Sequence, residues 1–121
     1  ASSVGHASHH ITAVGASREA LSVAVNAVAE AGGGLVVADE RGPLASLPLP
    51  LAGLMSDQPA ADVAAGVRAV RAAAAELGCT LPDPFMTLSF ISLSVIPALR
   101  LTPAGLVDVT RFERTALSAE A

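Results

Sequence analysis

Two stretches with helical periodicity, separated by a short extended segment, constrain the fold of this chain most strongly. Apolar residues recur every three or four positions in the first stretch, at Leu21, Ala24, Val25, Val28 and Ala31. They recur in the same way in the second stretch, at Val63, Val67, Val70, Ala74 and Leu77. This spacing gives each helix one apolar face, so both helices must pack against another element.

Residues that begin and end helices flank both stretches. Ser17 is a good N-cap for the first helix, and glycines 32–34 end it because glycine accepts the left-handed conformation of a C-cap. Pro59 suits the first turn of the second helix, and Gly78 ends that helix. Three glycines in a row also resemble a phosphate-binding loop. Such loops follow a strand and open a helix, however, whereas these glycines follow a helix.

Short strands and turns are predicted elsewhere in the chain. Residues 35–38 and 43–47 should form a hairpin across a turn at residues 39–42. Residues 86–93 alternate apolar and hydroxylated side chains, which predicts a strand. Residues 99–101 and 106–109 should pair across a turn that contains proline and glycine, and residues 113–121 should be a tail.

These elements predict an α+β fold, in which a mixed sheet has two amphipathic helices packed on one face. The 121 residues suit one domain with a single core, predicted over residues 1–112. Hydrophobic residues make up 52% of the chain and charged residues 15%, which favours a packed core over disorder. This apolar excess also favours an interface, because exposed apolar patches usually mark one.

Charge and cysteine content exclude several classes of function. The net charge is −4, lysine is absent, and no basic run occurs, which argues against binding to nucleic acid or to an anionic membrane. No apolar run approaches the roughly 18 residues that span a bilayer. Cys79 is the only cysteine, which suits a reducing cytoplasm. It follows a helix C-terminus and is predicted to be structural rather than a nucleophile. The chain has no initiator methionine, and we expect it to be a piece of a longer protein.

All three histidines lie within five consecutive residues, at His6, His9 and His10, and Ser8 lies between them. The stretch should be a turn that enters a short strand at residues 11–14. It is the one place in the sequence where chemistry can be argued, but these residues alone name no reaction.

Several longer strings resemble the C-terminal domain of bacterial adenine deaminase. They are GGGLVV at residues 32–37, LPLPLAGLMSD at 47–57 and LGCTLPDPFMTLSFISLSVIP at 77–97. The opening SSVGHASHHI at residues 2–11 is similar to the signature of that domain, which reads serine, valine, a small residue, then His-Asp-Ser-His-Asn. His6, Ser8 and His9 match the signature, whereas Ala7 takes the place of its aspartate and His10 that of its asparagine.

The resemblance implies the amidohydrolase superfamily and the conversion of adenine and water to hypoxanthine and ammonia in purine salvage. It also implies a divalent metal (Mn, Fe or Zn) in a (β/α)₈ barrel that would precede Ala1. Such a barrel takes about 250 residues. We therefore expect no cofactor and no catalytic residue in this chain, which alone should be inactive. The expected partner is the barrel of the parent enzyme, and a homo-oligomer is left open.

Different roles remain open for the histidine stretch. His6, Ser8 and His9 could line the adenine pocket at the mouth of the barrel, or they could cap a turn beneath the interdomain surface. A zinc site of His6, His9 and His10 is the weaker alternative, because adjacent side chains point apart in an extended chain and Ala7 supplies no carboxylate. For the whole chain, the alternative is a stand-alone, non-enzymatic module that self-associates or binds a partner.

Overall fold

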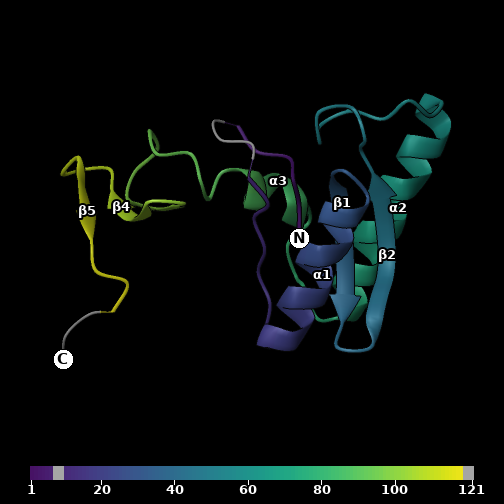
Figure 1. Ribbon diagram of the computed structural model, residues 1–121, viewed down its shortest axis with the longest axis horizontal. Coiled ribbons are helices and arrows are strands. Elements are labelled where there is room, and N and C mark those ends of the chain that lie inside the picture. Colours follow the sequence, from purple (N-terminus) through teal and green to yellow (C-terminus); the bar gives the residue numbers. More distant parts are fainter. Residues whose placement is uncertain (7–9, 119–121) are drawn as a thin grey trace.

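The computed structural model describes residues 1–6 and 10–118. Its elements, in chain order, are α1 (Arg18–Glu30), β1 (Gly34–Asp39), β2 (Gly42–Pro48), α2 (Ala60–Glu76), α3 (Pro84–Ser89), β3 (Leu99–Thr102), β4 (Gly105–Asp108) and β5 (Glu113–Thr115). The predicted α+β class is confirmed. Figure 1 shows two parts, an α/β layer that contains the three helices with β1 and β2, and an arm that carries β3, β4 and β5 away from it.

The predicted hairpin is confirmed as β1 and β2. The two strands pair antiparallel, from Gly34 opposite Pro48 to Asp39 opposite Gly42. Asp39 closes the turn, since its Oδ1 accepts hydrogen bonds from the backbone N–H groups of Arg41 and Gly42 at 2.8 and 3.1 Å. The bond from the Arg41 backbone, together with the Arg41 guanidinium, lowers the pKa of the Asp39 carboxyl below its usual value.

The two long helices cover opposite faces of this hairpin. Val36 packs against Val28 of α1, whereas its neighbours Leu35 and Val37 pack against Val70 of α2. Successive side chains of a strand point to opposite sides, so α1 and α2 lie on either side of β1 (Figure 1). The prediction that both helices share one face is therefore wrong. The unbroken burial from Gly34 to Val37 fits a strand that is covered on both faces.

The strands form two separate antiparallel sheets rather than one mixed sheet. The second sheet has the order β3-β4-β5, with Leu101 opposite Leu106 and Asp108 opposite Glu113. The predicted pairing of residues 99–101 with 106–109 is confirmed for β3 and β4. The first three residues of the predicted tail, 113–121, belong to the sheet instead. Glu113–Thr115 form β5 and pair with β4.

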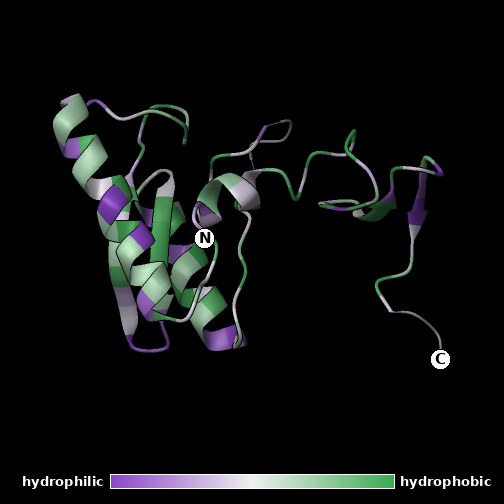
Figure 2. Ribbon diagram, turned by 180° about the vertical axis from the view of Figure 1, so that it is seen from behind, coloured by the Kyte–Doolittle hydropathy of each residue, from purple (hydrophilic) through white to green (hydrophobic). Residues whose placement is uncertain are grey.

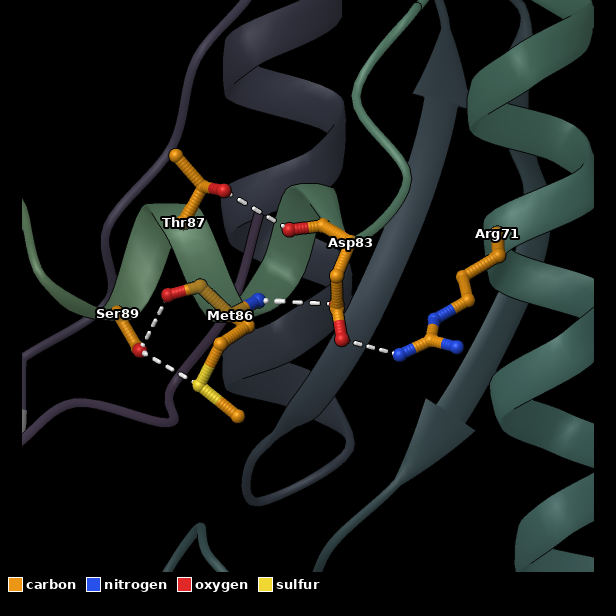
Figure 3. Close-up of polar contacts among 5 residues, drawn as sticks. All are labelled: Arg71, Asp83, Met86, Thr87 and Ser89. Carbon is orange, nitrogen blue, oxygen red and sulfur yellow. Dashed lines mark hydrogen bonds and ion pairs between the residues drawn. The ribbon is translucent and has the colours of Figure 1, made fainter.

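The strand predicted over residues 86–93 is wrong, because residues 84–89 form the short helix α3. Asp83 caps this helix, and its carboxylate accepts a hydrogen bond from the Met86 N–H at 3.2 Å. The Thr87 hydroxyl donates to the Asp83 carbonyl at 2.9 Å (Figure 3). Arg71 of α2 also forms an ion pair with Asp83, so that one carboxylate both starts α3 and ties it to α2 (Figure 3).

The predicted ends of the long helices are confirmed. The Ser17 hydroxyl accepts a hydrogen bond from the Ala20 N–H at 3.1 Å and caps α1. Gly32 follows α1 with a φ of 71°, and Gly78 follows α2 with a φ of 91°, which is the left-handed conformation expected after a helix. None of the described helices combines the length and the apolar character that a membrane span requires.

Candidate functional site

The first residues of the chain lie along the edge of β1. The Ala1 amino group donates to the Val36 carbonyl at 2.7 Å, and the Val36 N–H donates to the Ala1 carbonyl at 2.9 Å. The Ser3 N–H donates to the Gly34 carbonyl at 3.0 Å. These bonds pair the N-terminal segment with β1 on the edge opposite β2. Burial at this edge lowers the pKa of the Ala1 amino group to about 6.

The histidine stretch is closed at its base by one backbone pair. Ser2 and Thr12 exchange two hydrogen bonds of 2.8 and 2.9 Å, and Ser2 is completely buried. The chain therefore passes the same point of the fold before and after the three histidines. We call residues 3–11 the histidine loop. Compact loops whose ends meet in this way frequently carry function on a scaffold that holds them in place.

The Ser3 hydroxyl fastens the start of the histidine loop to two glycine segments. Its Oγ donates to the Gly53 carbonyl at 2.6 Å and accepts from the Gly34 N–H at 2.8 Å. Gly33 makes room for this contact, because a Cβ added there would lie 2.3 Å from the Gly53 Cα. The glycines after α1 thus hold the loop as well as ending the helix. Local sequence patterns could not have revealed this, since Ser3 and Gly53 are fifty residues apart.

His6 lies on the ring of Phe90. The ring centroids are 4.3 Å apart, and the ring planes are inclined by 38°. Phe90 is the C-cap of α3, whose start is fixed to α2 by Asp83 and Arg71 (Figure 3). The exposed imidazole of His6 is therefore placed at the end of α3, where the chain leaves the α/β layer for the arm.

An apolar cleft of about 920 Å³ lies between the start of α1, the end of β1, the end of α2 and α3. Its apolar walls include Val14, Leu21, Leu77, Cys79, Phe85 and Leu88. Cys79 is half-buried in this wall, and its structural role stays a prediction. The cleft could not be predicted from the sequence, because its walls come from four elements that only the fold brings together. None of the described histidines lines this cleft.

Comparison with known proteins identifies the family. Residues 1–113 match the family model of the adenine deaminase C-terminal domain. This chain belongs to that family. Curated relatives named adenine deaminase include those of Ruegeria pomeroyi (49% identity over 114 residues), Kosmotoga olearia (50% over 109) and Moorella thermoacetica (50% over 113). These alignments cover 94%, 90% and 93% of this chain, but each covers only 19% of the relative. The adenine deaminase C-terminal domain thus spans about a fifth of the length of the curated relatives that it matches.

The structure of the adenine deaminase C-terminal domain places only part of the predicted site. His6 lies on Phe90, and His10 is exposed on the other side of the undescribed segment. Ser8 and His9 lie outside the described residues, so their role in a substrate pocket stays a prediction. The weak zinc candidate of His6, His9 and His10 lies partly outside them too. Within residues 1–6 and 10–118, no group of three or more His, Cys, Asp or Glu side chains could hold a metal ion.

Proposed function

We propose that this domain serves an adenine deaminase of the amidohydrolase superfamily, acts in purine salvage in the cytoplasm, and supports a catalytic portion outside this chain. The observation that carries the proposal is the family match over residues 1–113, combined with relatives that bear this name and are about five times longer than the matched part. The same match disfavours the alternative of a stand-alone module.

The proposed reaction replaces the exocyclic amino group of adenine with oxygen. Water adds to C6, the bond between C6 and the amino nitrogen breaks, and hypoxanthine and ammonia leave. A divalent metal (Mn, Fe or Zn) in the catalytic portion would make water nucleophilic near neutral pH by lowering its pKa. This domain would contribute binding and positioning instead.

The histidine loop is the part of the domain that we propose to reach the adenine pocket. Its base is fixed by the Ser2–Thr12 backbone pair, and its His6 ring is held on Phe90 while remaining exposed. Imidazole can donate or accept a hydrogen bond near neutral pH, which suits recognition of the ring nitrogens of a purine. His6, Ser8 and His9 are the residues that we expect to line that pocket.

A comparison of the full-length parent protein with this chain tests the proposal. Both are incubated with adenine and Mn²⁺, Fe²⁺ or Zn²⁺, and hypoxanthine is followed by chromatography. The parent should turn over, and the 121-residue chain alone should not. Sustained turnover by the isolated chain would show that no further catalytic portion is needed. Absence of turnover by the metal-loaded parent would refute the assigned reaction.

Two matched substitutions in the parent protein test the role of the loop. His6→Ala should lower kcat/KM by about tenfold or more, because misplaced substrate loses rate steeply. His10→Asn introduces the residue of the family signature and should leave kcat/KM near its original value. Equal activity of His6→Ala and the unmodified parent, with folding intact by circular dichroism, would exclude the pocket-lining role.

A further inference from the structure

The arm exposes apolar side chains on one face of its sheet. Leu101 lies directly opposite Leu106, and Leu99 is two residues before Leu101, so that all three point to the same side. Leu99 is 50% exposed and Leu101 is 47% exposed. We call these three residues the leucine face.

The other face of the arm is partly covered by its own chain. Val109 is 4% exposed and Ser92 is 6% exposed, and both line a pocket with Val107. The Leu101 N–H also donates to the Ile91 carbonyl at 3.1 Å, which places the preceding segment beside the free edge of β3. The arm therefore has one face packed against its own residues and one face, the leucine face, left open.

No partner for the leucine face is found in the described part of the α/β layer. The strands of the arm contact one another extensively, but no comparable contact joins them to α1, α2, α3, β1 or β2. Figure 2 shows hydrophobic stretches along the arm beside a hydrophilic β5. A sheet of strands this short gains stability by burying its apolar face. We therefore expect a surface outside the described residues to cover it.

Phe112, in the turn between β4 and β5, does not belong to the leucine face. Its side chain is 89% exposed, and its φ of 54° lies in the left-handed region, which is unfavourable for a bulky residue. It lines the pocket with Ser92, Val107 and Val109, on the other face of the arm. The open apolar surface is therefore the leucine face alone.

We propose that the arm docks onto the catalytic portion of its own polypeptide through the leucine face. This inference rests on the proposed function in so far as the domain is part of a longer enzyme. The curated relatives are about five times longer than the part that this chain matches, so most of each such protein is available as a surface. Because both surfaces belong to one chain, the effective concentration is high and a small patch is sufficient.

A second copy of this chain fits the arm less well. Three partly exposed leucines offer far less than the roughly 800 Å² that each partner contributes to a stable interface. The edge of β5 carries Glu113 and Arg114, which are both exposed. Charged residues on an edge strand disfavour pairing between sheets of two copies.

Photo-crosslinking in the full-length parent protein tests the proposal. A benzophenone amino acid replaces Leu101, and the matched control replaces Leu44 of β2, which is exposed to nearly the same degree at 49%. Position 101 should give an intramolecular product, which keeps the mass of a monomer and joins the arm to a peptide upstream of Ala1. Its yield should be at least tenfold higher than the yield from position 44. A product at twice the monomer mass, equal yields from both positions, or no product would overturn the proposal.

Charge substitutions give a second readout that does not depend on activity. The double substitution Leu99→Asp and Leu101→Asp should lower the equilibrium constant for docking of the arm at least tenfold for each leucine. Limited proteolysis of the arm in the parent should accelerate accordingly, whereas Leu44→Asp should not accelerate it. An unchanged cleavage rate in the double variant would contradict the proposal. A parent that crosslinks from position 101 without deaminating adenine would refute the proposed reaction and leave the docking intact.

Discussion

Replacement of Gly33 by alanine tests how the histidine loop is fastened to the fold. The new Cβ would lie 2.3 Å from the Gly53 Cα, 3.0 Å from the Leu49 carbonyl oxygen and 3.1 Å from the Ser3 Oγ. Carbon atoms pack best at about 3.5–4.0 Å. The overlap with Gly53 therefore exceeds about 1 Å, and it involves backbone on both sides.

The free energy of unfolding should fall by about 3–6 kcal/mol. Overpacking against backbone costs about 1–3 kcal/mol, or more where nothing can move. The φ of 123° at Gly33 adds strain of about 1–2 kcal/mol for a residue with a side chain. Displacement of the Gly53 turn would also break its hydrogen bond to Ser3, which contributes about 1 kcal/mol.

Gly32→Ala is the matched control. Gly32 also has a positive φ, 71°, but a Cβ there would meet nothing within 4 Å. It should therefore cost only about 1–2 kcal/mol of backbone strain. Urea denaturation followed by circular dichroism should place Gly33→Ala at least about 2 kcal/mol below Gly32→Ala. The midpoint of thermal unfolding should be lower by roughly 10 °C.

The result that refutes this reasoning is a Gly33→Ala variant as stable as Gly32→Ala. It would mean that the Gly53 turn moves away at little cost, and that the Ser3 contact does not hold the histidine loop. If the loop is held as described, the Gly33→Ala parent protein should also lose adenine turnover more than the Gly32→Ala parent does.

Further predictions concern the third helix, the amino terminus and the stacked rings. Asp83→Ala should cost about 1–2 kcal/mol of stability, since it removes the cap of α3 and the partner of Arg71. Asp83→Asn keeps a capping oxygen and loses only an ion pair whose side chains are 43% and 37% exposed, so it should cost less than about 1 kcal/mol in urea denaturation; equal losses would exclude a role for the cap. In the isolated 121-residue chain the Ala1 amine is free and its folded pKa is about 6, below its ordinary 8.0, so the stability of that isolated chain should rise between pH 6 and pH 8. Acetylation of this amine keeps an N–H donor and removes the charge, so thermal unfolding should lose that part of the pH dependence, and an unaltered dependence would assign it to other groups. Phe90→Leu keeps an apolar contact but removes the aromatic ring, so the NMR resonances of the His6 ring should move; unshifted resonances would show that the rings do not stack in solution.

Much of the α/β layer could be predicted because its determinants are local. The Ser17 cap and the glycines after each helix act within a few residues of the helix ends, so the ends of α1 and α2 agree with the structure. The side on which each helix packs is less local. It depends on the burial of Leu35, Val36 and Val37 in succession, a pattern that is typical of a strand covered on both faces.

The error in residues 86–93 has a specific cause. Alternating side chains favoured a strand, but Asp83 and Pro84 together supply a helix cap and a residue suited to the first turn. The capping interactions prevailed over the alternation. Asp-Pro before an apolar stretch was the local pattern that could have indicated α3.

The candidate site could be predicted only in part. The sequence placed His6 in a turn near a strand, but its contact with Phe90 joins residues 84 positions apart. The hydroxyl contacts of Ser3 and the walls of the apolar cleft depend equally on distant segments. Such contacts are fixed by the packing of elements, which local patterns do not specify.

The pairing of Ser2 with Thr12 has a consequence for how such a domain can change over time. Both hydrogen bonds join main chain to main chain, so no particular side chain between them is required for the closure. Substitutions at positions such as Ala7 and His10, where this chain departs from the family signature, can accumulate without shifting the register of the strands beneath. The loop can therefore vary in sequence while the strands that carry it keep their pairing.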